Sequence, residues 1–247
     1  MTEAKARLLI LGATSDIGLA TARRFARDGH PIMLAARSAD ALERDVADLT
    51  LRGSPEVSRH HLDILDTDSH AGFLAGLPHR PDIVLCVIGL LGDQTAAAED
   101  PIQAAAILRS NFEGPALLLG RLATEFEARG RGCIIGISSV AGDRGRASNY
   151  LYGAAKAGFT AFLSGLRNRL CKSGVQVLTV KPGFVRTRMI EGMRTPAALT
   201  AQPEEVAEAI HRGWTRDRNV IYVRPVWWLI MAIIRAIPEQ VFKRLSL

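Results

Sequence analysis

The sequence is poor in cysteine, and the cysteines that it has are not closely spaced. Cys86, Cys133 and Cys171 are far apart, and no C-x-x-C pair occurs. Cys86 and Cys133 lie within apolar runs, where a cysteine behaves as a small hydrophobic residue. We therefore expect buried free thiols at these two positions, with neither a disulfide framework nor a metal site.

The sequence also lacks an apolar run long enough to span a bilayer. The most apolar stretch, Val226–Ile237, covers twelve residues, whereas a transmembrane helix needs about 20. The N-terminal stretch, Met1–Arg7, is short and polar and does not resemble a signal peptide. These features predict a cytoplasmic protein.

Signals for nucleic-acid recognition are missing as well. The net charge of +6, with an isoelectric point near 9.6, could serve nucleic acid, a membrane surface or an anionic substrate. The basic residues are dispersed and no recognition motif is present, so we expect no nucleic-acid partner. With 48% hydrophobic and 23% charged residues, the composition is that of a globular protein and excludes disorder.

Apolar runs of strand length alternate with segments of helix length along the whole chain. Most of these runs are continuously apolar, as expected when helices cover both faces of a sheet. No linker, repeat or low-complexity tract interrupts them. The pattern predicts one α/β domain over residues 1–247, a Rossmann-type doubly wound parallel sheet of seven strands flanked by helices. The predicted strands are Leu8–Leu11, Ile32–Ala36, Val57–Leu62, Ile83–Ile88, Cys133–Ser138, Val175–Val180 and Val220–Val223.

The first strand is followed by a glycine-bearing turn, Gly12–Gly18. Glycines here allow a tight turn and a close approach of backbone N–H groups to a pyrophosphate at a helix N-terminus. The spacing is not G-x-G-x-x-G, and Asp16 stands where a further glycine is usual. We expect Asp16 to cap a helix that starts at Ile17. A plain left-handed turn before a packed helix remains an alternative for this loop.

The end of the second strand lacks the acidic residue that an NAD site places there. The sequence has Ala36-Arg37-Ser38 instead, and an arginine suits the 2′-phosphate of NADP. We therefore favour NADP(H) over NAD(H), although Arg37 could also be a solvated residue at a helix start. Asp63 follows the third strand. We expect it either to lie near the adenine of the cofactor or to cap a helix N-terminus.

Tyr152 and Lys156 are four residues apart in a predicted helix, roughly Asn149–Lys172, and therefore share one face. A phenol is a poor acid or base at neutral pH, and a nearby ammonium is expected to lower its pKa. Ser139 stands at the end of the fifth strand, where its hydroxyl can hold a carbonyl oxygen as charge develops. The three side chains predict proton transfer to or from a carbonyl or alcohol.

Together these motifs resemble the short-chain dehydrogenase/reductase family over essentially the whole chain. The residues that carry the resemblance are Gly12–Gly18, Asn111, Ser139, Tyr152 to Lys156, and Pro182-Gly183. One stretch departs from the family pattern, because Cys86–Gly89 replaces an Asn-Asn-Ala-Gly sequence. Asp16 is the second departure.

The resemblance implies a role for each catalytic candidate. Tyr152 is the general acid/base, and Lys156 lowers its pKa and holds the nicotinamide ribose. Ser139 orients the substrate carbonyl, and Asn111 steadies a water in the proton relay. The residues implied in cofactor binding are Gly12, Thr14, Ser15, Asp16, Ile17, Gly18, Arg37, Asp63, Ile64, Gly89, Tyr152, Lys156, Pro182, Gly183, Val185 and Thr187.

Several separated stretches are similar to a narrower group within the family, the reductases of a 2-keto sugar carried on a polyprenyl phosphate. They are Asp66–His70, Ile88–Asp93, Ser138–Lys156, Pro182–Met189 and Ile237–Leu245. This resemblance implies a role in cell-wall biosynthesis and a partner oxidase that makes the keto sugar. A lipid, steroid or other hydrophobic ketone is the alternative substrate, and an NADP-sensing regulatory protein is the non-enzyme alternative.

Two further features fit an anionic, apolar substrate. Arginines cluster in the two loops expected to line the pocket, where guanidinium groups could bind a phosphate, or else contact the cofactor or water. They are Arg144, Arg146, Arg186 and Arg188. The apolar tail from residue 226 to 247 could lie in a membrane interface at the inner face, or be buried in the core or a subunit contact. The family resemblance also implies a homodimer or a homotetramer.

Overall fold

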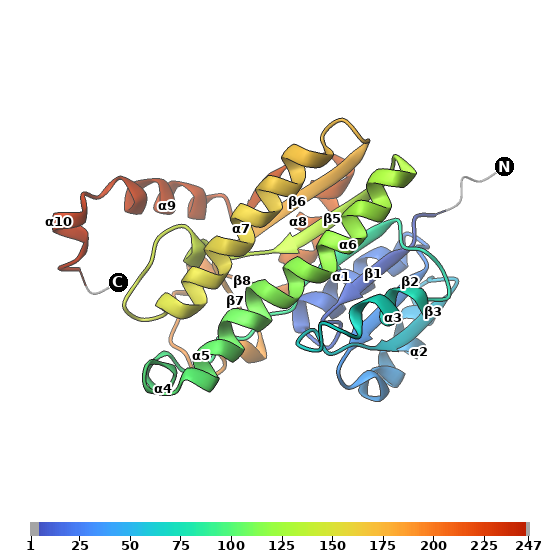
Figure 1. Cartoon of the computed structure of the whole chain (residues 1–247), viewed down its shortest axis with the longest axis horizontal. Helices are drawn as coiled ribbons and strands as arrows, with labels where there is room; N and C mark the ends of the chain where they lie inside the picture. Colours follow the sequence, from blue (N-terminus) through green and yellow to red (C-terminus); the bar gives the residue numbers. More distant parts are fainter. Residues whose placement is uncertain (1–4, 246–247) are drawn as a thin grey trace.

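The computed structural model describes residues 5–245 and is built on a parallel sheet of seven strands (Figure 1). The strand order is β3-β2-β1-β4-β5-β6-β9, so the direction of winding reverses between β1 and β4. The predicted doubly wound sheet is confirmed, with strand ends shifted by one or two residues. The strands are β1 (Leu8–Leu11), β2 (Ile32–Ala36), β3 (Val57–His61), β4 (Ile83–Cys86), β5 (Gly132–Ile137), β6 (Val175–Pro182) and β9 (Val220–Val223).

Helices cover both faces of this sheet because successive strand residues point to opposite sides. Leu8 and Ile10 of β1 belong to the core beneath α1, α2 and α8, whereas Leu9 and Leu11 belong to the core beneath α6 and α7. The helices of the first face are α1 (Asp16–Arg27), α2 (Glu43–Leu51) and α8 (Pro203–Thr215). Those of the second face are α3 (His70–Ala75), α6 (Gly114–Arg129) and α7 (Tyr150–Leu170). Cys86 and Cys133 are buried free thiols, as predicted.

An irregular helical segment joins β4 to the second layer of helices. It consists of α4 (Gln94–Glu99), α5 (Pro101–Leu108) and a π-helical turn, Arg109–Glu113, that runs into α6. Asp100 caps α5, since its Oδ1 accepts a hydrogen bond of 2.8 Å from the Ile102 N–H. The π turn was not predicted, and turns of this kind frequently occur at functional sites.

A small two-stranded sheet lies beyond the end of β6 and was also not predicted. Its strands are β7 (Phe184–Val185) and β8 (Thr200–Ala201), which pair in parallel. Since each has only two residues, neither gives a recognisable hydrophobic pattern. Their pairing closes the loop between them over the carboxyl edge of the main sheet.

The C-terminal segment forms α9 (Val226–Ala236) and α10 (Glu239–Phe242), which project beyond the carboxyl edge of the sheet (Figure 1). Trp227 and Met231 of α9 are buried against the body of the protein. On the opposite side of α9, Trp228, Leu229 and Ile233 are more than half exposed. Within residues 5–245, no helix is both long and apolar enough to cross a membrane.

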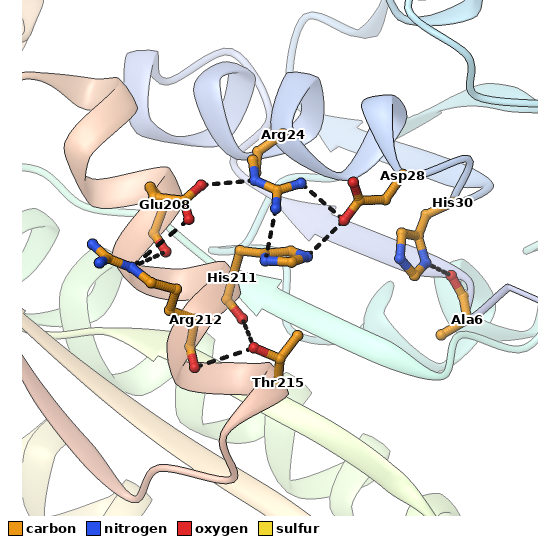
Figure 2. Close-up of polar contacts among 8 residues, drawn as sticks. All are labelled: Ala6, Arg24, Asp28, His30, Glu208, His211, Arg212 and Thr215. Atoms are coloured by element: carbon orange, nitrogen blue, oxygen red, sulfur yellow. Dashed lines mark hydrogen bonds and ion pairs between the residues drawn. The ribbon is translucent and has the colours of Figure 1, made fainter.

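Charged residues of α1 and α8 form a cluster at the edge of the first helical layer (Figure 2). The Arg24 guanidinium lies 2.7 Å from the Glu208 carboxylate and 2.8 Å from Asp28. It also lies 3.1 Å from Nδ1 of His211, whose Nε2 is 2.9 Å from Asp28. Because a guanidinium can only donate, Nδ1 must accept and Nε2 must carry the proton. His211 is therefore held as a neutral imidazole between a cation and an anion.

The stability of the protein should therefore fall in mild acid. Burial, and then the Arg24 charge, lower the pKa of His211. The unfolded chain then binds more protons than the folded chain as the pH falls below the ordinary histidine value, so stability is present above that value and is lost below it. We predict that His211→Gln flattens the dependence of the unfolding free energy on pH between 7 and 5, by at most about 1.4 kcal/mol per pH unit.

Urea unfolding at several pH values measures this effect. His79→Gln is a matched control, because His79 is an exposed histidine whose ion pair with Glu56 is also exposed. If the two variants showed the same pH dependence, the assignment of the acid-sensitive group to His211 would be wrong.

Candidate active site

A pocket of about 660 Å³ opens at the carboxyl edge of the sheet, where ligands bind in doubly wound folds. It brings together nearly all of the site residues predicted from the sequence. Those that line it are Gly12, Thr14, Ser15, Asp16, Ile17, Arg37, Asp63, Ile64, Gly89, Ser139, Arg146, Tyr152, Lys156, Pro182, Gly183, Val185, Thr187 and Arg188. Gly18, Asn111 and Arg144 are not among its lining residues.

The three catalytic candidates lie where β5 meets α7. A side-chain hydrogen bond joins Ser139 to Tyr152, and the Ser139 Oγ also accepts from the Ala141 N–H at 3.1 Å. Lys156 is almost fully buried, with its Nζ donating to the Ile137 carbonyl at 3.0 Å. The same Nζ lies 5.7 Å from the centre of the Tyr152 ring. The predicted serine, tyrosine and lysine therefore form one cluster.

Burial dominates the electrostatics of this cluster. Burial raises the pKa of Tyr152 to about 12, and the hydrogen bond from Ser139 only partly opposes it. Burial also lowers the pKa of Lys156 to about 8. Desolvation is thus the largest influence on both groups, and the expected lowering of the Tyr152 pKa by Lys156 stays a prediction. Tyr152 remains protonated at neutral pH and can act as a proton donor.

Asn111 lies in the π turn behind the pocket and is fully buried. Its side-chain amide donates to the Leu90 carbonyl at 2.6 Å and to the Ile107 carbonyl at 2.8 Å. Its Oδ1 accepts from the Leu90 N–H at 3.2 Å. Asn111 thus fixes the chain after β4 against the helices; the water-holding role stays a prediction.

The Gly12–Gly18 turn has the shape that a pyrophosphate site requires. Gly12 has a φ of +91°, and a Cβ there would lie 2.9 Å from the Ile88 side chain. A Cβ at Gly18 would lie 2.8 Å from the Ser15 Oγ. Both positions therefore need glycine, and the turn delivers the chain to the N-terminus of α1, where an anion is favoured. These residues fit a dinucleotide.

Asp16 does not cap α1 as expected. The helix begins at Asp16 itself, and Ser15 is the cap, since its Oγ accepts from the Gly18 N–H at 3.0 Å. The Asp16 carboxylate accepts from the Arg188 N–H at 2.9 Å and forms an ion pair of 3.3 Å with its guanidinium, which also donates to the Thr14 carbonyl. Arg188 therefore compensates the charge of Asp16 beside the anion-binding helix end, and it binds the cofactor loop.

Arg37 follows β2 and Asp63 follows β3, and both line the pocket. In the strand order these two strands are separated by β1 and β4 from β5, which carries the catalytic cluster. The Arg37 side chain is exposed, and no acidic residue within 5–245 pairs with it. Asp63 accepts a hydrogen bond of 3.0 Å from the Leu65 N–H through its Oδ1. A free guanidinium at this end fits a 2′-phosphate.

Arg144 was expected at the substrate, and the structure places it elsewhere. Its guanidinium donates to the backbone carbonyls of Ile234 at 3.0 Å and Ile237 at 2.6 Å, pairs with Glu239 at 2.7 Å, and lies 3.9 Å from the centre of the Phe242 ring. Carbonyls at a helix C-terminus have no partner within the helix, and a cation is favoured there. Arg144 therefore holds the C-terminal segment in place.

Trp227 is a wall residue that the sequence analysis did not assign to the pocket. A Cβ at Gly183 would lie 1.9 Å from its ring, and its Nε1 donates to the Leu199 carbonyl at 3.1 Å. The ring also packs edge-on against Phe184. Further apolar residues that line the pocket are Leu90, Leu91, Val140, Met189, Ile190 and Met193. Apolar side chains therefore line the same pocket as the catalytic cluster.

Comparison with known proteins agrees with this geometry. Residues 6–197 match the short chain dehydrogenase family. Uncharacterized oxidoreductases of Mycobacterium tuberculosis and Streptomyces coelicolor are both 38% identical, over 97% and 96% of this chain and 97% and 95% of their own. A short-chain dehydrogenase of Sphingobium yanoikuyae, solved with NADPH, has a TM-score of 0.80 at 25% identity and covers 95% of this chain and 97% of its own.

The chain belongs to the short-chain dehydrogenase/reductase family. It is an NAD(P)-dependent oxidoreductase that acts on carbonyl and alcohol groups. A bound nicotinamide cofactor supplies or accepts the hydride in this chemistry. The protein supplies the proton: Ser139 can donate a hydrogen bond to the carbonyl oxygen, and Tyr152 can protonate that oxygen.

The depressed pKa of Lys156 gives a test of the buried cluster. Between about pH 8 and 10 the unfolded chain holds the lysine proton and the folded chain releases it, so the stability of the wild-type protein should rise with pH. The full contribution is about 3 kcal/mol. We predict that Lys156→Met removes this rise, measured by urea unfolding from pH 7 to 10. Lys172→Met, at an exposed position, should keep it; identical curves for both variants would contradict the assignment.

Proposed function

We propose that the protein uses NADPH to reduce a ketone that carries a large apolar group. The observation that carries this proposal is that Ser139 and Tyr152 share one pocket with Trp227 and other apolar side chains. Tyr152 is protonated at neutral pH and can therefore supply the proton that a carbonyl oxygen takes up on reduction. Arg37 supports NADPH over NADH.

The narrower candidate is a 2-keto sugar on a polyprenyl phosphate. It rests on the resemblance to decaprenylphosphoryl-2-keto-β-D-erythro-pentose reductase at several stretches, Ser138–Lys156 and Pro182–Met189 among them. An isoprenoid chain would suit the apolar wall formed by Met193 and Trp227. A partner oxidase, a place in cell-wall synthesis and a dimeric or tetrameric state remain predictions of the resemblance.

The exposed side of α9 supports an apolar, lipid-bearing substrate. Trp227 faces the pocket while the neighbouring Trp228 faces outward, and Leu229 and Ile233 are exposed beside it. A helix with such an outer face can lie in a membrane interface. In this proposal the protein acts at the cytoplasmic surface of a membrane, with α9 next to the lipid that carries the substrate.

The reaction is tested by following NADPH oxidation with a polyprenyl-phosphoryl 2-keto-pentose, a long-chain ketone and a short ketone. We expect turnover of at least one apolar ketone and a loss of about 100-fold or more in kcat for Tyr152→Phe, because general acid catalysis contributes about that much. Tyr150→Phe is the control, since Tyr150 is exposed and lies two residues away. Tight NADPH binding without turnover of any ketone would favour an NADP sensor instead.

The cofactor preference is tested at Arg37. We predict that Arg37→Asp lowers the ratio of kcat/KM for NADPH to that for NADH by about 100-fold, because a charge-assisted contact to the 2′-phosphate is replaced by repulsion. Arg44→Asp, on α2, provides a control for the same change of charge at a position outside the pocket. An unchanged ratio in Arg37→Asp would mean that Arg37 does not select the cofactor.

A further inference from the structure

Four arginines occupy the two loops beside the pocket, and three of them are accounted for. Arg144 holds the C-terminal segment, and Arg188 is paired with Asp16. Arg186 is exposed and lines an adjoining hollow, but not the main pocket. Arg146 is the member of the four that lines the main pocket without an ion-pair partner among residues 5–245.

The Arg146 guanidinium is partly desolvated in the pocket wall. Its Nε is buried, with no hydrogen-bond partner in the described part of the chain. Burial also lowers the pKa of Arg146. The nearest acid in the sequence, Asp143, is already committed, because its carboxylate lies 2.5 Å from Lys181 Nζ and accepts from the Tyr222 hydroxyl at 2.8 Å. Among residues 5–245, no acidic group therefore pairs with Arg146.

Placing a cation in such a position opposes folding, since a desolvated charge is unfavourable until it is paired. Groups of this kind mark binding and catalytic sites. A second polar atom of the pocket lining also lacks a hydrogen-bond partner. The Asn149 Oδ1 is buried and accepts no hydrogen bond from the described residues. One donor and one acceptor, both without a partner among residues 5–245, thus belong to residues that line the same pocket as Tyr152.

Arg146 follows β5 in the same loop as Ser139, whereas the pyrophosphate turn follows β1, with β4 between these strands. Arg146 lines the same pocket as Ser139 and Tyr152. The substrate that these two residues orient is therefore the expected carrier of an anion for Arg146.

We propose that Arg146 binds an oxyanion of the substrate, a phosphate or a carboxylate, and so selects ketones that combine an anionic group with an apolar one. A guanidinium suits either anion, because its fork of N–H groups can donate two parallel hydrogen bonds. Asn149 Oδ1 accepts from a hydroxyl group near that anion. This inference deepens the proposed ketone reduction and rests on it.

The test compares three ketones with the same alkyl chain, which end in a phosphate ester, a carboxylate or a methyl ether. For the wild-type protein with NADPH, we expect kcat/KM to be about 10- to 100-fold higher for one or both anionic ketones than for the ether. Arg146→Gln should remove this preference through KM, so that the anionic ketones fall toward the level of the ether. Arg146→Lys should restore part of it. Arg186→Gln should keep it in full.

A binding measurement that needs no turnover accompanies the kinetics. Inorganic phosphate should raise the melting temperature of the wild-type protein and of Arg186→Gln in the presence of saturating NADPH, and should raise that of Arg146→Gln less. The phosphate and carboxylate arms show which oxyanion is preferred, and both results support the proposal.

Two kinetic outcomes would overturn it. In one, Arg146→Gln slows the ether as much as the anionic ketones, which would assign Arg146 to the structure of the pocket. In the other, the variant keeps the preference for an anion. If the wild-type protein reduces no ketone at all, the proposed function fails, and the phosphate-dependent melting shift alone decides whether Arg146 binds an oxyanion.

Discussion

The contact between the end of β5 and the first turns of α7 determines the rest of the site. Ser138 donates to the Lys156 carbonyl at 3.1 Å, and Lys156 returns a hydrogen bond to the Ile137 carbonyl at 3.0 Å. These two bonds fix the helix against the strand in one register. Ser139 directly follows Ser138, and Tyr152 lies one helical turn before Lys156. The side chains of Ser139 and Tyr152 are therefore held within hydrogen-bonding distance of each other. Proximity of this kind is what a positioned acid requires.

Much of the fold and of the site could be predicted because the signals are local. Continuous apolar runs mark the buried strands, and the spacing of Tyr152 and Lys156 fixes a shared helix face. What could not be predicted depends on contacts between distant segments. The π turn that presents Asn111, and the two-residue strands β7 and β8, leave no pattern in the sequence. The pairing of Asp16 with Arg188 joins residues 172 positions apart.

The effect of burial on the pKa of Tyr152 could not be predicted for the same reason. From the sequence, the Lys156 charge four residues away is visible, whereas the desolvation of the pocket is not. Desolvation is a property of the packed protein, and here it acts on both groups in the direction that disfavours charge. Packing therefore leaves a phenol that is harder to deprotonate beside an ammonium that is easier to deprotonate.

The attachment of the C-terminal segment has a consequence for how the pocket can diversify. The Arg144 guanidinium donates hydrogen bonds to backbone carbonyls at the end of α9, and the Trp227 ring packs against Gly183, which has no side chain. Neither anchor depends on the outward-facing side chains of α9, such as Trp228 and Ile233. Substitutions on the outer face of α9 can therefore change its polarity without moving the wall that its inner face gives the pocket. In the proposed function, the outer face would contact the membrane and the inner face the substrate, so these two properties could change independently in evolution.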